Sequence, residues 1–516
     1  MSSAKMVKAG ITVGGWTFVS RILGLMRDIV LANAVGASAG ADAFFVAFKI
    51  PNFLRRLFGE GAFAQAFVPV FSEVREKEDE ASLQRLVNQV AGRFGLIVVL
   101  VAALGVLGAP VIAVIFAPGF AHDPGKLALT AELLRWTFPY LALISLVAFS
   151  GGILNSIGKF AVPAATPIFL NISLIGCAVF LSPLLSPSVL GLAIGVLVAG
   201  IIQLLVQLPS LFSAGLLPKP SLQSDHPGVA KILRLMVPAL FGVSVSQINL
   251  LLDTVLASFL VSGSVSWLYY SDRLMELPLG VIAIAVSTVI LPKLSREFTH
   301  SDAKASQETQ TWAIWVVMVL GLPCALVLAV FGELILSTLF QYGAMSALDI
   351  QAASDSLAAY AAGLPAFMLI KVLAPHYFSR QDTGTPVKIG LLAMVANMIF
   401  NLILVWHLEH VGLALATSLS AWINALLLLW CLHKRNWYCI DGIPIKKIFQ
   451  LGLGLLLMAQ VAWWAPDALA LETKSIIERA LWTGGLLGLS GFLYLGGLAM
   501  TGIRYTSLLF PPSACD

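Results

Sequence analysis

The chain has 516 residues, of which 59% are hydrophobic and 11% charged, and its formal net charge is +4. With a mean hydropathy of +0.91, this composition excludes an ordinary soluble globular protein and indicates a polytopic membrane protein. The small and dispersed positive charge argues against a nucleic-acid partner. The first apolar stretch continues through Arg21 and Arg27 without a cleavage site, so we expect no cleaved signal peptide.

Apolar runs long enough to span a bilayer, at about 20 residues per crossing, predict about fourteen helices. In chain order they fall near 8–34, 40–72, 86–116, 130–157, 161–182, 189–214, 230–260, 265–292, 311–340, 352–378, 386–406, 411–432, 447–465 and 477–502. Alternate loops then hold eighteen Lys and Arg on one side and only Lys126, Lys474 and Arg479 on the other. Because basic loops stay in the cytoplasm, we expect both termini there.

Four short motifs recur along the chain at a nearly constant offset. FAPG at 116–119 matches FQYG at 340–343, and VPVFSE at 68–73 matches LPKLSRE at 291–297. Pro139 pairs with Pro365, and Pro163 with Pro386. These matches predict two six-helix halves, 1–215 and 226–435, with the same orientation in the membrane, followed by two extra helices in 446–516.

Charged residues interrupt the same helix pair in each half. In the first half they are Arg21, Arg27, Asp28, Asp42, Lys49, Arg55, Arg56 and Glu60, and in the second Asp253, Asp272, Arg273 and Glu276. Each charge at membrane depth costs about 2.5–3.5 kcal/mol, so we expect most of them to line a central cleft. Two alternatives remain open: internal salt bridges such as Arg273 with Asp42 or Glu276, and Arg55 and Arg56 reaching the headgroups. Since the excess of positive charge is small, an anionic ligand is inferred from the arginine side chain, whose planar fork suits phosphate.

A second polar group is expected to bind a coupling cation. Asn397 and Asn401 are four residues apart on one helix face, Thr417 lies on the next helix, and Asp253 supplies a carboxylate. Such oxygens suit Na⁺ or a proton. The alternative is that Asn397, Asn401 and Thr417 form hydrogen bonds between helices.

Enzymatic readings have weaker support. The cysteines lack redox or zinc spacing, and His407 and His410 lie at a short turn without an evident third ligand. The rival functions are a membrane glycosyltransferase or polymerase acting on polyprenyl-linked sugars, and an exporter of a drug or of another polyprenyl-diphosphate-linked sugar. Short periplasmic loops disfavour the first, and clustered arginines disfavour a cationic drug.

Residues 20–73 and 242–281, with APGF at 117–120 and SRQDTGTPVKI at 379–389, resemble the MurJ (MviN) lipid II flippases. The resemblance extends over essentially the whole chain. It implies the fold of the multidrug/oligosaccharidyl-lipid/polysaccharide exporter superfamily, an all-α membrane protein with two lobes. It further implies transport of lipid II, an undecaprenyl-diphosphate-linked disaccharide peptide, to the periplasmic leaflet of the bacterial inner membrane.

The resemblance also implies roles for individual residues. The arginines Arg21, Arg27, Arg55, Arg56 and Arg273, with Asp42 and Glu276, correspond to functionally important cavity residues. From the charge pattern we expect Asp28, Asp42 and Glu276 to hold the arginines when no lipid is bound, and Lys49 to belong to the same site. The family further implies a sodium site between the helices of Asp253, Asn397 and Thr417 and a groove for the polyprenyl tail at 446–516. We expect no cofactor. Membrane lipids and the cell-wall synthesis machinery are the other expected partners.

Overall fold

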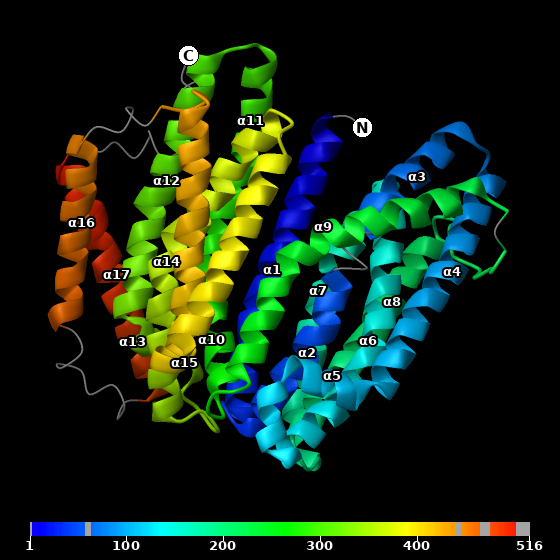
Figure 1. Cartoon of the computed structure of the whole chain (residues 1–516), viewed down its shortest axis with the longest axis horizontal. Coiled ribbons are helices and arrows are strands. Elements are labelled where there is room, and N and C mark those ends of the chain that lie inside the picture. Colours follow the sequence, from blue (N-terminus) through cyan, green and yellow to red (C-terminus); the bar gives the residue numbers. More distant parts are fainter. Residues whose placement is uncertain (1–2, 57–62, 224, 440–444, 465–474, 502–516) are drawn as a thin grey trace. The chain divides into compact units, whose positions relative to one another are not determined.

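A computed structural model describes residues 3–56, 63–223, 225–439, 445–464 and 475–501 (Figure 1). These residues form helices and contain no strand, which confirms the predicted all-α fold. Nine helices among them are long and apolar enough to cross a membrane. The chain is therefore a multi-pass membrane protein. Glu60 of the predicted charge set lies outside the described residues.

The chain forms two compact units, one of residues 1–266 with 342–345, and one of 267–341 with 346–516. The first contains α1 (Ser3–Val35), α2 (Ala39–Arg55), α3 (Ala64–Lys77), α4 (Glu80–Leu107), α5 (Ala109–Phe116), the 3₁₀ turn η2 (Pro118–His122), α6 (Pro124–Ser156), α7 (Ala161–Gly176), η3 (Cys177–Leu181), η4 (Ser182–Leu184), α8 (Val189–Phe212) and α9 (Pro227–Ala257). Helix α10 (Ser264–Pro278) begins at the boundary between the units, and most of it belongs to the second. The second unit further contains η5 (Leu279–Ala283), α11 (Ile284–Thr299), α12 (Ala303–Val330), α13 (Gly332–Phe340), α14 (Ala347–Ser379), α15 (Gly384–Lys434), α16 (Ile445–Trp464) and α17 (Ile476–Met500). By its contacts α9 belongs to the first unit, where it packs against α3. The division into halves at 1–215 and 226–435 stays a prediction.

Helix boundaries recur at the offset that the motifs show. α4 and α12 begin 223 residues apart, at Glu80 and Ala303, and also end 223 residues apart, at Leu107 and Val330. α6 and α14 likewise begin at 124 and 347 and end at 156 and 379.

The N-caps repeat with the helices. Asp79 and Asp302, and then Asp123 and Ser346, each accept a backbone hydrogen bond at the start of their helix. Short polar caps satisfy the first free N–H groups of a helix. The same local signals therefore start corresponding helices in both halves, which supports the internal repeat.

Four predicted continuous helices are broken in the structure. The run 86–116 divides at Gly108 into α4 and α5, and 311–340 divides at Phe331 into α12 and α13. The runs 161–182 and 265–292 each contain a π-helical turn, η3 after α7 and η5 between α10 and α11. The run 40–72 covers α2 and α3, and residues 57–62 between these helices lie outside the described residues. Uniform hydropathy hides these breaks, because a membrane helix can change direction without a polar residue.

Helix α15 covers two of the predicted spans, 386–406 and 411–432. Its backbone leaves the helical region at Glu409, with φ 49° and ψ −129°, and the helix reverses there. The two predicted helices are therefore confirmed, joined by a very short turn.

The glycines of the repeated FAPG and FQYG segments, Gly119 and Gly343, pack in a matched way inside the first compact unit. Gly119 donates its N–H to Ser258 Oγ at 3.0 Å, and a Cβ atom on Gly119 would clash with the Ser258 backbone. Gly343 lies against Asn33, and the next residue, Ala344, donates its N–H to the Asn33 carbonyl at 2.9 Å. Each glycine thus permits a close approach to the last turn of α9 or α1.

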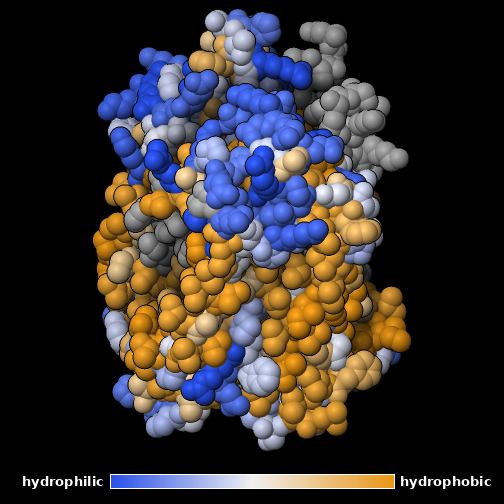
Figure 2. Space-filling model, turned by 90° about the vertical axis from the view of Figure 1, so that its right-hand side faces the viewer, coloured by the Kyte–Doolittle hydropathy of each residue, from blue (hydrophilic) through white to orange (hydrophobic). Residues whose placement is uncertain are grey.

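The apolar residues serve both the core and the surface. Phe63, Phe67, Phe94 and Phe149 stack in the core between α3, α4 and α6. The exposed side of α4 is also apolar, from Leu96 to Leu107. Figure 2 shows such hydrophobic side chains over the middle and lower part of one face, with hydrophilic residues gathered above them and a smaller group at the lower edge. That distribution suits a protein surrounded by lipid.

The two C-terminal helices pack on α12. α16 and α17 contact each other, and Tyr494 of α17 donates its hydroxyl to the Val319 carbonyl at 2.5 Å. Residues 465–474 and 502–516 of the predicted tail segment lie outside the described residues.

Candidate functional site

Arg27 and Asp28 form a buried ion pair in α1. Arg27 donates from Nε and Nη2 to Asp28 Oδ1 at 2.9 and 2.6 Å, and from Nη1 to Asn171 Oδ1 of α7 at 3.1 Å. Asn171 in turn donates to the Ser20 carbonyl at 3.0 Å. The guanidinium therefore ties α1 to α7, while Arg21 of the same helix is only partly buried.

Asp42 is 1% exposed and has partners on both carboxylate oxygens. Oδ2 accepts from Lys126 Nζ at 2.9 Å and from the Gly263 N–H at 2.7 Å, and Oδ1 accepts from the N–H and hydroxyl of Ser266 at 3.0 and 2.7 Å. Buried charges are stable when such partners replace water. Asp42 thus anchors the start of α10 to α2 and α6.

The other first-half charges lie farther along α2. Lys49 donates to Thr254 Oγ1 of α9 at 3.2 Å, so its ammonium lies beside the helix that carries Asp253. Arg55 donates from Nε to Asn52 Oδ1 at 2.8 Å, and Arg56 caps the end of α2. All of these side chains are partly buried.

In the second unit, Arg273 and Glu276 form an ion pair on α10 with Nη1 and Oε2 2.9 Å apart. The guanidinium also lies over the Tyr269 ring, 5.0 Å from its centroid. The Arg273 side chain is 33% exposed, whereas that of Arg27 is 8% exposed. Of the salt bridges proposed from the charge pattern, the structure shows the one between Arg273 and Glu276.

The three polar residues of α15 form hydrogen bonds with one another, as the alternative of hydrogen bonds between helices expects. Asn397 donates to Thr417 Oγ1 at 3.3 Å, and Asn401 donates to Asn397 Oδ1 at 3.1 Å. Both asparagines are buried. Asp253 belongs to α9 in the other compact unit, so its participation stays a prediction.

His407 and His410, at the turn within α15, have ordinary polar contacts. His410 Nδ1 lies 2.9 Å from Ser356 Oγ, and His407 Nδ1 lies 3.2 Å from the Ile403 carbonyl. Within the described residues, no group of three His, Cys, Asp or Glu side chains is placed to hold a metal.

The SRQDTGTPVKI segment between α14 and α15 contains an ion-paired turn. Asp382 accepts from Thr385 N–H and Oγ1 at 3.0 and 2.6 Å, and from Arg435 Nη1 at 2.5 Å. Burial alone raises the pKa of Asp382, but the Thr385 hydrogen bonds and Arg435 lower this pKa to about 2. Asp382 therefore stays ionised and fixes the turn.

Sequence reasoning missed two residues of the charge network. Asn171 carries no charge, so nothing in the sequence pointed to its contact with Arg27. Lys126 was interpreted only as a marker of membrane topology, because it is one of three basic residues on the expected periplasmic side. The structure buries it against Asp42, 84 residues away.

A family model described as lipid II flippase MurJ matches residues 31–478. The chain belongs to this family. A probable lipid II flippase MurJ of Vibrio cholerae is 47% identical over 98% of each chain, and one of Haemophilus influenzae is 44% identical over 96% of this chain and 99% of its own. A lipid II flippase MurJ of Burkholderia cenocepacia is 37% identical over 97% of this chain and 98% of its own.

Solved structures agree with the family. A MurJ structure in an inward closed conformation has a TM-score of 0.80 and 28% identity, covering 97% of this chain and 100% of that chain. An inward-facing MATE family transporter of the MOP superfamily has a TM-score of 0.65 at 14% identity, covering 83% of this chain and 98% of that chain, and shares the fold alone. The superfamily fold expected from the sequence is confirmed.

Proposed function

We propose that the chain is a flippase that moves lipid II from the cytoplasmic to the periplasmic leaflet of the bacterial inner membrane, with both termini in the cytoplasm. The observation that carries this proposal is the family match, which extends along nearly the whole chain at up to 47% identity. The process needs no covalent chemistry. It needs a binding site for the lipid and two conformations that expose this site alternately.

Arginines at membrane depth are the proposed ligands of the diphosphate. Arg273 is the best placed in the described structure, because its guanidinium is partly exposed and paired with a carboxylate that phosphate can replace. Arg21, Arg55 and Arg56 are also partly buried rather than enclosed. Arg27 is nearly enclosed by Asp28 and Asn171, so its first role is to hold α1 and α7 together.

A cation is the proposed source of direction. The amide and hydroxyl oxygens of Asn397, Asn401 and Thr417 are of the hard type that Na⁺ prefers, and Asp253 would supply the charge. The hydrogen bonds among the three polar residues, from Asn401 to Asn397 and from Asn397 to Thr417, support the proposal by bringing these side chains together. A bound cation would bias the two conformations by its different affinity for each.

The proposal is tested by transport in reconstituted vesicles. Labelled lipid II placed in one leaflet should reach the other when the protein is present, and depletion of the protein in cells should leave lipid II in the cytoplasmic leaflet. Unchanged leaflet distribution in both experiments would contradict a flippase. Polymerisation of the lipid by purified protein would instead favour the glycosyltransferase alternative.

A further inference from the structure

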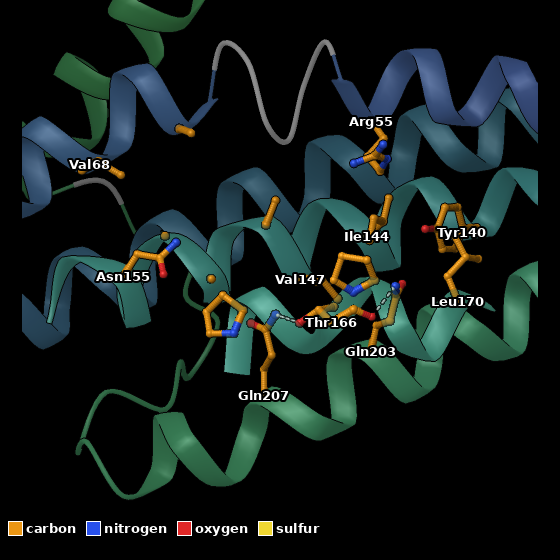
Figure 3. A pocket seen from close by; sticks show the side chains of 16 residues that line it. Arg55, Val68, Tyr140, Ile144, Val147, Asn155, Thr166, Leu170, Gln203 and Gln207 are labelled. Atoms are coloured by element: carbon orange, nitrogen blue, oxygen red, sulfur yellow. Dashed lines mark hydrogen bonds between the residues drawn. The ribbon is translucent and has the colours of Figure 1, made fainter. Parts of the chain in front are cut away.

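A pocket of about 480 Å³ lies inside the first compact unit, between the end of α2 and the helices α3, α6, α7 and α8. Figure 3 shows that its wall combines polar side chains with aliphatic residues. Gly151, Gly152 and Ala148 open one side of it. Pockets of about 300–1,000 Å³ with a few converging polar groups are typical of sites for small molecules.

Two glutamines of α8 give this pocket its polar character. Gln203 and Gln207 are 2% and 1% exposed, and both project into the pocket (Figure 3). Their Nε2 groups donate to the Thr166 carbonyl and hydroxyl at 3.0 and 3.1 Å, which fixes the orientation of the amides. Neither Oε1 atom has a hydrogen-bond partner among the described residues. A buried acceptor without a partner is unfavourable, so both oxygens are ready for a donor.

The charge of the pocket narrows the class of ligand. Arg55 lines it and points toward it, and none of the lining residues, all in the described part of the chain, is acidic. A bare cation is disfavoured by Arg55, and a wholly apolar group would leave both glutamine oxygens unsatisfied. The arrangement fits a neutral group rich in O–H or N–H donors that is attached to a phosphate.

We propose that this pocket is a subsite for the disaccharide of the transported lipid, with sugar hydroxyls donating to Gln203 Oε1 and Gln207 Oε1. Arg55 then contacts the phosphate next to the sugar. The inference rests on the proposed function, because lipid II joins a disaccharide to a diphosphate. The proposed subsite assigns a role to α8, a helix without charged residues. Its glutamines would distinguish lipid II from a polyprenyl diphosphate that lacks the sugars.

The test compares the affinities of purified protein for lipid II and for undecaprenyl diphosphate, which lacks the sugars. The wild type should bind lipid II more tightly. Gln203→Met and Gln207→Met should each lose about three- to tenfold in affinity for lipid II, the usual effect of one hydrogen bond, and should keep their affinity for undecaprenyl diphosphate. Gln89→Met is the matched control, because Gln89 is a buried amide of the same unit that bonds to His226 N–H outside the pocket.

A second variant fills the pocket without touching a hydrogen bond. Ala148→Leu should lower the affinity for lipid II alone, and it provides the result if the methionine variants fail to fold. The inference would be overturned if the pocket variants lost equal affinity for both lipids. It would also be overturned if all of them kept the wild-type affinity for lipid II. Failure of the wild type to bind lipid II would overturn the proposed function as well.

Discussion

Arg27 and Arg273 carry the same charge at membrane depth in different surroundings. Arg27 is enclosed by a carboxylate and an amide of its own unit, and Arg273 has a third of its side chain exposed. Burial of a charge is tolerated when its partners are fixed, whereas ligand binding requires access. The structure therefore separates a helix-tying arginine from one suited to bind an anion, although the sequence presents both as arginines in apolar helices.

Replacing Arg273 by Ala is expected to abolish complementation of a strain depleted of the protein, while the variant still inserts in the membrane. Arg273→Lys should restore little, because an ammonium cannot form the two parallel hydrogen bonds that a guanidinium offers phosphate. Growth and the amount of protein in the membrane fraction are the measurements. Normal growth of Arg273→Ala would remove this residue from the diphosphate site.

Asp382 gives a prediction that depends on pH. Its pKa in the folded protein, about 2, is below the ordinary value of 3.8, so its contribution to stability is complete above pH 3.8 and is lost as the pH falls toward 2. Asp382→Asn should lower the unfolding temperature at pH 7, by a free energy of about 1 kcal/mol because the pair with Arg435 is partly exposed. The difference from wild type should stay constant from pH 7 to 5 and shrink below pH 4. A difference that grows in acid would contradict this assignment.

Residue contacts were only partly predictable. The pairing of Arg273 with Glu276 follows from a spacing of three residues on one helix, which places both side chains on one face. The meeting of Asn397, Asn401 and Thr417 follows from a helix pair joined by a very short turn. The contact of Asp42 with Lys126 joins helices far apart in the chain, and a single sequence carries no information about which distant helices pack together.

Hydropathy predicts where helices occur better than it predicts whether each helix is continuous. All fourteen predicted runs coincide with helical segments of the described structure, since an apolar run in lipid must satisfy its own backbone groups. The breaks at Gly108 and Phe331 were missed, because hydropathy is the same on both sides of each. The repeat relates the two breaks to each other, since these residues are 223 apart.

The turn within α15 makes a testable element-level prediction. Glu409 has a positive φ that residues with a Cβ atom rarely adopt, and this costs about 1–3 kcal/mol. Glu409→Gly should therefore raise the unfolding temperature of the protein in detergent, by a free energy of about 1 kcal/mol after the entropic penalty of glycine. Glu409→Ala is the control, because it removes the carboxylate and keeps the strained Cβ. An equal rise in both variants would assign the effect to the charge.

For the whole molecule, Asp253→Asn should separate binding from transport. The substitution removes the charge proposed to hold the cation and leaves the proposed diphosphate ligands unchanged. Binding of lipid II should stay within about threefold of wild type, while transport in vesicles falls strongly, because a ligand shifts a conformational equilibrium only by its differential affinity. Vesicles with and without a sodium gradient or a membrane potential give the measurement. Transport that ignores both gradients and survives Asp253→Asn would make this cluster structural.

Topology is the second property of the whole molecule that can be tested. In a background without native cysteines, Ser186→Cys and Leu348→Cys should react with a membrane-impermeant thiol reagent in intact cells with a permeabilised outer membrane. Glu78→Cys, Leu222→Cys and Asp302→Cys should react only after the inner membrane is opened. All five positions are exposed in the structure, so reactivity reports the side of the membrane. Labelling of Leu222→Cys from outside would overturn the predicted helix count.

The paired contacts of Gly119 and Gly343 have a consequence for ancestry. Gly119, in the first half of the sequence, lies against Ser258 at the end of α9, and Gly343, in the second half, lies against Asn33 at the end of α1. In a symmetric dimer, residue i of one subunit contacts j of the other, and j of the first contacts i of the second. The two glycines and their two partners obey this rule at offsets of 224 and 225 residues. A six-helix protein with one copy of the motif would make both contacts by pairing with itself, so the two glycines lie where duplication and fusion of such a protein would place them.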